Sequence, residues 1–161
     1  PTLEDHRDLE VREAANHLFA LGNESVFIGD FFQVLDELKD LSNLKEGAIE
    51  LDIELKVSDS VITKLLGKLF IKTDDARDAI RAAESRLILG NDVISPLNTI
   101  NKNYGDVTID NVDYQRYMGE LQILKVSQKA DKRTNVVASI LHNKLYLLKY
   151  IKSGKKVLFL I

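Results

Sequence analysis

The sequence predicts an all-α fold, an up-down bundle of four to six helices that forms a single domain over residues 1–161. Two observations lead to this prediction. Apolar residues recur at helical spacing along most of the chain. The 161 residues also include only 8 Gly and 2 Pro, the residues that most often interrupt a helix. Helices joined by short loops pack most simply as a bundle.

The N-terminal part of the chain predicts two helices, over residues 3–22 and residues 25–44. The first helix carries an apolar face, formed by Val11, Ala14, Ala15, Leu18 and Leu21. Gly22 is expected to end it. The second helix carries an apolar stripe, formed by Phe27, Phe31, Val34, Leu35, Leu38 and Leu41. Both patterns are typical of helices that bury one side.

Residues 47–58 depart from this pattern, because apolar and charged side chains alternate there with the period of a strand. The apolar C-terminal segment can pair with them, so we expect a minor two-stranded β element from residues 48–57 and residues 155–161. The alternative for residues 47–58 is a helix buried on two sides, because Glu, Asp, Leu and Lys are not typical strand residues. The alternative for the tail is that its apolar character reflects only where the chain was cut.

Three further helical regions are expected, over residues 59–72, residues 73–90 and residues 111–152. Their expected N-cap residues are Asp59 or Ser58 for the first, Thr73 for the second and Asp110 for the third. In an alternative interpretation, the second of these helices continues through a kink at Pro96 to about residue 103.

The charges are segregated along the chain. Residues 1–120 contain 13 Lys and Arg against 24 Asp and Glu, whereas residues 121–161 contain 9 against 1. A basic stripe on one helix face is expected within the second part, formed by Lys125, Lys129, Lys132 and Arg133. Such a stripe can dock an acidic protein surface, nucleic-acid phosphates or anionic lipids. It can also be neutralised by the chain's own acidic helices, or simply be solvated.

The three histidines fall into two groups. One stripe of the first helix combines imidazoles with carboxylates, from His6, Glu10, Glu13 and His17. These are metal-compatible ligand types, but one helix seldom completes a site, so we expect a polar surface and no metal. The second group, His142, Tyr146 and Tyr150, repeats every four residues. These residues are expected to line a pocket or partner groove, or else to mark the boundary between core and solvent.

Several kinds of site are excluded by composition and spacing. The chain has no Cys, which removes disulfides, thiolate metal sites and cysteine nucleophiles. Its glycines stand singly, so no phosphate-binding loop motif is present. No apolar run approaches the roughly 20 residues needed to cross a bilayer, and the first residues do not resemble a signal peptide. A soluble, cofactor-free protein is expected, either cytoplasmic or a processed organellar or exported form.

The sequence therefore predicts no catalytic residue and a non-enzymatic function. We expect a helical interaction or scaffold module that binds a protein partner through its basic C-terminal helical region. Three alternatives stay open: a ligand-holding bundle that serves as a sensor or carrier, a binder of nucleic acid or anionic membrane, and an enzyme whose site combines distant carboxylates with His142. Self-association into a homo-oligomer is compatible with each of them.

Overall fold

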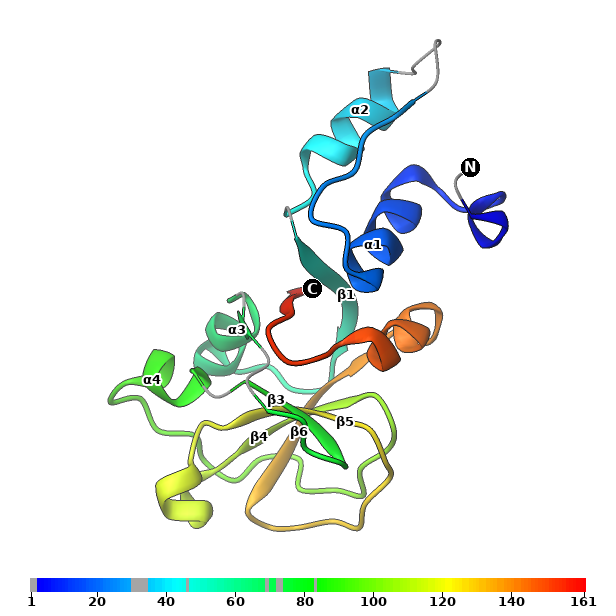
Figure 1. The fold of residues 1–161 in the computed structure, drawn as a ribbon. Helices are drawn as coiled ribbons and strands as arrows, with labels where there is room; N and C mark the ends of the chain where they lie inside the picture. Colours follow the sequence, from blue (N-terminus) through cyan, green and yellow to red (C-terminus); the bar gives the residue numbers. More distant parts are fainter. Residues whose placement is uncertain (1–2, 30–34, 46, 69, 72–73, 83) are drawn as a thin grey trace.

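The computed structural model describes residues 3–29, 35–45, 47–68, 70–71, 74–82 and 84–161, and it contains both helices and strands (Figure 1). The strands are β1 (Ala48–Leu55), β2 (Phe70–Ile71), β3 (Ala79–Ala82), β4 (Asp106–Asp110), β5 (Leu121–Leu124), β6 (Thr134–Ile140) and β7 (Lys156–Leu160). The α-helices are α1 (Val11–Leu21), α2 (Leu35–Ser42), α3 (Ser60–Leu66) and α4 (Ser85–Leu89). Three 3-10 helices are η1 (Glu4–His6), η2 (Val112–Tyr117) and η3 (His142–Tyr150).

The seven strands form one sheet in the order β2-β7-β1-β6-β4-β5-β3. The sheet curves into a nearly closed barrel, so the fold is mixed α/β and the prediction of an all-α bundle is wrong. The barrel encloses a continuous core of aliphatic side chains, which includes Ile49, Leu51, Val107, Ile109 and Ile123. The prediction of a single domain over the whole chain stays a prediction.

β1 and β7 pair in parallel, from Ala48 beside Lys156 to Asp52 beside Leu160. The alternating pattern of residues 47–58 is therefore a strand, and the apolar C-terminal segment is its neighbour. The expected pair does not stand alone, however. β1 also pairs with β6, and β7 also pairs with β2, so both segments lie inside the seven-stranded sheet.

The predicted helix over residues 111–152 is replaced by η2, β5, β6 and η3. β6 is the clearest case, because six of its seven residues are buried. Because β6 is buried on both faces, its apolar residues do not alternate with exposed polar ones, and the pattern that identifies a strand is absent. Apolar residues at helical spacing can then be found in the same run, and this produced the wrong prediction.

Asp110 was expected to cap a helix, but it is the last residue of β4. In the structure every residue of β4 is buried. The Asp106 carboxylate accepts a hydrogen bond from Lys56 Nζ at 2.8 Å, and the Asp110 carboxylate accepts one from Thr134 Oγ1 at 2.9 Å. These partners lie 50 and 24 residues away in the sequence, and they stabilise polar groups that would otherwise be costly to bury.

The helix predictions hold in part. Asp59 caps α3, because its carboxylate accepts hydrogen bonds from the backbone N–H groups of Val61 and Ile62 at 2.9 and 3.0 Å. The helix ends at Leu66 rather than near residue 72, and β3 and α4 replace the next predicted helix. Several residues of the predicted helices, Phe31, Val34 and Thr73 among them, lie outside the described residues.

α1 is attached to β1 through the backbone of Glu50. Asn16 Nδ2 donates to the carbonyl oxygen of Glu50 at 2.7 Å, and the Glu50 N–H donates back to Asn16 Oδ1 at 2.9 Å. The buried Glu50 carboxylate also accepts from Arg12 at 2.7 Å. Because these contacts involve backbone atoms of the strand, they hold α1 in one position beside the sheet, while α2 projects away from it (Figure 1).

No helix within the described ranges combines the length and the apolar character needed to cross a membrane.

Candidate functional site

A cleft with a volume of about 540 Å³ lies between α1 and η3. One wall comes from η1, α1 and the segment that joins them, and the other wall comes from η3, more than 120 residues later. The cleft is lined by Asp5, Leu9, Glu10, Glu13, His17, Asn143, Tyr146, Lys149 and Tyr150. It therefore combines carboxylates, aromatic rings, an amide, an imidazole and an ammonium group.

His17 is the most buried polar residue of the cleft, with 7% of its surface exposed. Its Nδ1 atom lies 2.9 Å from Nε2 of His6. The rings of Tyr146 and Tyr150 lie 5.5 and 5.1 Å from its ring, measured between centroids. The Nε2 atom of His17 is buried and has no hydrogen-bond partner among the residues that the structure describes. A buried polar atom normally has a partner, so this nitrogen marks a place in the cleft wall where a hydrogen-bonding group is missing.

The protonation states of the cleft follow from burial. Burial lowers the pKa of His17, and the neighbouring charges of His6 and Lys149 lower it further. Burial, followed by the nearby Glu13 carboxylate, raises the pKa of Tyr146. At pH 7 both groups are therefore neutral. Neutral groups of this kind form hydrogen bonds with uncharged hydroxyl and amide groups without a large desolvation cost.

A buried lysine joins the two walls of the cleft. Lys144, on η3, is 3% exposed, and its Nζ atom forms ion pairs with the carboxylate of Glu13 on α1 and with that of Asp52 on β1. The distance to Asp52 is 3.1 Å. The Lys144 ammonium group thus connects η3 with α1 and β1. These ion pairs, together with packing, hold η3 in its position beside α1.

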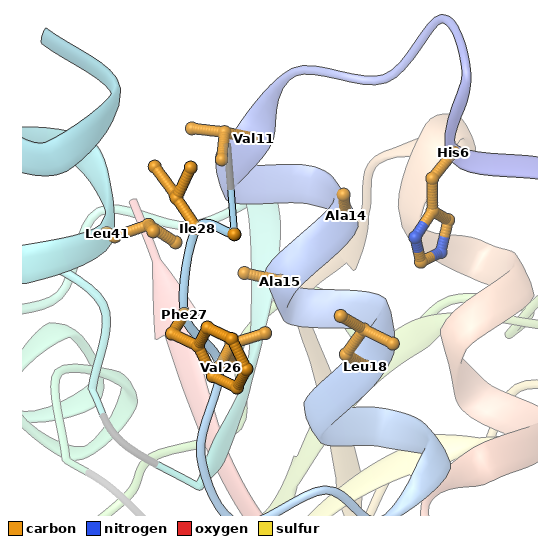
Figure 2. A pocket seen from close by; sticks show the side chains of 10 residues that line it. His6, Val11, Ala14, Ala15, Leu18, Val26, Phe27, Ile28 and Leu41 are labelled. Carbon is orange, nitrogen blue, oxygen red and sulfur yellow. The ribbon is translucent and has the colours of Figure 1, made fainter. Parts of the chain in front are cut away.

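The other side of α1 is apolar. A pocket of about 420 Å³ lies between α1, the segment that follows it and α2; the side chains that line it are drawn in Figure 2. Its walls carry the apolar stripe predicted for α1, including Val11, Ala14 and Leu18, and they also carry Val26 and Phe27. Phe27 is 86% exposed. The apolar stripe of α1 therefore faces a half-open pocket instead of the core of the barrel.

The predicted basic stripe does not exist as a helix face. Its four residues lie on the loop between β5 and β6, where Lys125 donates to the carbonyl oxygen of Ala76 at 2.8 Å. Arg133 forms a two-pronged ion pair with Asp131, at 3.0 and 2.7 Å, and its guanidinium lies 4.4 Å from the centre of the Tyr114 ring. Lys129 and Lys132 are exposed. A docking role for these four residues, and self-association of the chain, stay predictions.

Parts of the two predicted groups come together in the cleft, whereas His6, in η1, contacts His17 without lining the cleft. Glu10, Glu13 and His17 line one wall, and Tyr146 and Tyr150 line the other. His142 belongs to the same predicted group, but it is exposed and does not line the cleft. Among the described residues, no cluster of three or more His, Asp and Glu side chains is placed to hold a metal ion.

Four residues of the cleft were missed by the sequence analysis: Asp5, Leu9, Asn143 and Lys149. Two of them could have been found from the sequence. Asn143 and Lys149 each lie three residues from Tyr146, and residues three apart are neighbours on a helix face, just as residues four apart are. Asp5 and Leu9 precede α1, and no periodic pattern covers them.

Two family models match the chain. A model described as "6-phospho-N-acetylmuramidase, C-terminal" matches residues 49–160, which is more than half of the chain. A model described as "6-phospho-N-acetylmuramidase, N-terminal" matches residues 1–43. The cleft between α1 and η3 therefore lies at the junction of the two matched segments.

Two solved structures are similar over nearly the whole chain. An uncharacterized B. cereus protein is 28% identical with a TM-score of 0.84, and the match covers 99% of this chain and 47% of that one. A conserved Enterococcus faecalis protein with an unknown function is 27% identical with a TM-score of 0.63, and the match covers 99% and 44%. The chain spans less than half the length of either protein. A comparison with curated proteins gave no match.

These matches correct the functional prediction. The sequence predicted a non-enzymatic interaction or scaffold module, whereas both matching models are named after a glycosidase. The prediction failed because it rested on the absence of a catalytic motif, and a site assembled from distant side chains leaves no motif in one sequence. The chain belongs to the 6-phospho-N-acetylmuramidase family.

Proposed function

We propose that the protein containing this chain hydrolyses glycosides of 6-phosphorylated N-acetylmuramic acid, and that the cleft between α1 and η3 contributes to sugar binding. One observation carries the proposal. Two models of the same enzyme family match consecutive segments, in the order that their descriptions give, and together they span nearly the whole chain.

The chemistry of the cleft supports binding of such a sugar. A sugar ring presents apolar C–H faces and hydroxyl edges, which suit the rings of Tyr146 and Tyr150 and the free nitrogen of His17. Asn143 can bind the acetamido group through its side-chain amide. The ammonium group of Lys149 lies 4.8 Å from the centre of the Tyr150 ring, and it supplies a positive charge for the phosphate or the carboxylate of the sugar.

Acidic residues complete the lining. Glu13 is bound to Lys144 and acts as a structural residue of the wall. Asp5 and Glu10 also line the cleft, and their carboxylates can accept hydrogen bonds from sugar hydroxyls. We propose a binding role for both.

The apolar pocket of Figure 2 supports an architecture in which the rest of a family N-terminal domain packs against α1. Residues 1–43 match the N-terminal model, and more than half of each solved relative lies outside the match. Val26, Phe27 and Ile28 form a short apolar run between two helices, a pattern consistent with a buried strand of a parallel sheet. Further structure of the N-terminal domain is therefore the occupant that we propose for the pocket.

Titration calorimetry with N-acetylmuramic acid 6-phosphate tests the binding role of the cleft. We expect Tyr150→Ala and Lys149→Ala each to weaken binding by about tenfold, the equivalent of one good contact. The matched control is Lys129→Ala, which removes an exposed lysine from the loop between β5 and β6. Equal losses in the control and in the cleft variants would overturn the assignment.

The activity is tested with the full-length protein and a disaccharide that carries the 6-phosphorylated sugar at its non-reducing end. We expect release of N-acetylmuramic acid 6-phosphate, and much slower cleavage of the same disaccharide without the phosphate. Failure to cleave the phosphorylated disaccharide, or equal cleavage of both, would contradict the proposed function.

A further inference from the structure

A second set of polar side chains lies on the other side of the domain from η3 (Figure 1), where a hydrogen bond from Arg86 to the carbonyl oxygen of Arg116 joins α4 to η2. A pocket of about 480 Å³ there is lined by Arg86, Leu87, Gln115, Arg116 and Met118. None of these residues contributes to the cleft between α1 and η3. The pocket therefore needs an explanation of its own.

The backbone around this pocket is held firmly. The buried Ser85 hydroxyl lies 2.7 Å from the carbonyl oxygen of Ala82 and 2.8 Å from that of Gly119, and it accepts a hydrogen bond from the Leu121 N–H at 2.9 Å. Gly119 has a φ of +84°, and a Cβ atom at this position would collide with Leu89. α4 and the residues after η2 are therefore packed in direct contact, which fixes the relative positions of Arg86 and Arg116.

Both guanidinium groups gather around one aromatic ring. The Cζ atoms of Arg86 and Arg116 lie 5.7 and 4.8 Å from the centre of the Tyr117 ring. Arg86 also donates to the carbonyl oxygen of Arg116 at 3.1 Å, and Arg116 donates to the Tyr117 hydroxyl at 2.9 Å. Stacking and these two hydrogen bonds restrict the arginine side chains before any ligand arrives, which lowers the entropic cost of binding.

The positive charge of this group is only partly neutralised. The Glu120 carboxylate lies 3.7 Å from Arg86 and 3.8 Å from Arg81, and Arg81 is also paired with Asp74 at 3.1 Å. Among the described residues, no carboxylate lies within ion-pair distance of Arg116. One positive charge is therefore left without a counter-charge, next to a second guanidinium group.

Gln115 adds a strained backbone to the same pocket. It has a φ of 53° and a ψ of −112°, although it is not glycine. A conformation of this kind costs about 1–3 kcal/mol and is found mainly at ligand sites and switches. Gln115 directly precedes Arg116 in η2, and its exposed side chain lines the pocket together with Arg86 and Arg116.

We propose that Arg86, Arg116 and Gln115 bind a phosphate monoester. Guanidinium groups form paired hydrogen bonds with phosphate oxygens, and the Gln115 amide can donate a further one. Leu87 and Met118 form an apolar wall that would contact the group esterified to the phosphate. A phosphorylated sugar is the expected ligand, and this identity rests on the proposed function, whereas the phosphate site itself does not.

The test is a titration of the chain with inorganic phosphate and with glucose 6-phosphate, followed by the amide NMR signals of residues 85–89 and 112–119. We expect saturable shifts of these residues with both ligands, whatever shifts the sugar phosphate also causes in the cleft, and at least about a tenfold loss of affinity for inorganic phosphate in Arg116→Ala. Arg116→Lys is expected to recover part of the affinity, because it keeps the charge but loses the paired hydrogen bonds. The matched control is Arg77→Ala, a highly exposed arginine that is paired with Asp78.

Three results would overturn the proposal: no saturable shift with either ligand, equal loss of affinity in Arg77→Ala, or unchanged affinity in Arg116→Ala. The outcome of this test can be distinguished from the outcome of the test of sugar binding in the cleft between α1 and η3. Tyr150→Ala should leave the shifts with inorganic phosphate unchanged, and loss of those shifts in Tyr150→Ala would place the phosphate in the cleft instead. Failure of glycoside cleavage would not alter phosphate binding at Arg116.

Discussion

The imidazole rings of His6 and His17 are in direct contact, with Nε2 of His6 2.9 Å from Nδ1 of His17. Both side chains are buried, and they come from η1 and α1. In such a pair only one ring nitrogen can donate to the other, so two protonated rings are strongly disfavoured. The contact keeps the free nitrogen of His17 in place beside the two tyrosines of the cleft.

The first prediction concerns the pH dependence of stability. The pKa of His17 is lowered in the folded state by burial and by His6. Folded His17 binds a proton less tightly than unfolded His17, whose pKa is about 6.5. The folded state therefore has its full stability above about pH 6.5 and loses stability as the pH falls below that value. Urea unfolding between pH 8 and pH 5 should therefore show a smaller loss of stability in His17→Gln than in the wild type. His142→Gln, at an exposed position, should behave like the wild type.

The second prediction concerns Lys144. Lys144→Ala leaves the Glu13 and Asp52 carboxylates without their shared cation, and we expect a loss of about 3 kcal/mol in the free energy of unfolding. Lys144→Met fills a similar volume and should cost less, because apolar replacement of a buried ion is often tolerated. Thermal unfolding followed by circular dichroism measures both. Equal stability of Lys144→Ala and the wild type would mean that the ion pairs do not hold η3.

The third prediction concerns Asp110. Burial raises the pKa of Asp110 to about 6, and the Glu120 carboxylate adds to the effect. An acid with a raised pKa binds its proton more tightly when folded, so stability falls as the pH rises from about 4 to about 6. Asp110→Asn keeps an acceptor for the Thr134 hydroxyl, and it should raise stability at pH 7 by at most about 3 kcal/mol.

Asp131 is the matched control for Asp110. Hydrogen bonds from Arg133 lower the pKa of Asp131 to about 2, so its contribution is present at neutral pH and is lost as the pH falls from about 4 to about 2. Asp131→Asn should therefore lower stability at pH 7, the opposite sign to Asp110→Asn. Denaturant unfolding at several pH values measures both variants, and the same sign in both would contradict this account.

The fourth prediction concerns Gln115. Glycine adopts positive φ without steric cost, so Gln115→Gly should raise the stability of the folded chain by about 1 kcal/mol. The same change removes the amide and should weaken phosphate binding. Stability is measured by thermal unfolding and binding by calorimetry. A variant that is less stable than the wild type would show that the backbone at Gln115 is not strained.

The fifth prediction concerns Phe27 in the apolar pocket. Phe27 is 86% exposed, so Phe27→Ser should change the stability of this chain by less than about 0.5 kcal/mol. In the full-length protein the same change should be clearly destabilising, because we propose that further N-terminal structure covers this side chain. Phe19→Ser, at a residue that is 5% exposed, should destabilise both forms. No effect of Phe27→Ser in the full-length protein would contradict the proposed packing.

The sequence identified those elements whose signals are local. The alternation of residues 47–58 identified β1, the apolar C-terminal segment identified its partner β7, and Asp59 identified the start of α3. Each signal depends on neighbours in the chain: a period of two, an uninterrupted apolar run, and a carboxylate within reach of the next N–H groups. Of the two predicted groups of histidines and their neighbours, Glu10, Glu13, His17, Tyr146 and Tyr150 line the cleft, whereas His6 lies in η1 and His142 does not line the cleft.

Tertiary structure decided the rest. The aspartates of β4 become strand residues only because Lys56 and Thr134, far away in the sequence, supply their hydrogen bonds. Nothing in the sequence brings η3 against α1, and without that contact neither the cleft nor the orphaned nitrogen of His17 exists. Periodicity reports which side of an element is apolar, but it does not report what covers that side. For this chain, the apolar stripe of α1 was visible in the sequence, whereas its position over a half-open pocket instead of the barrel core was not, because burial depends on contacts between distant segments.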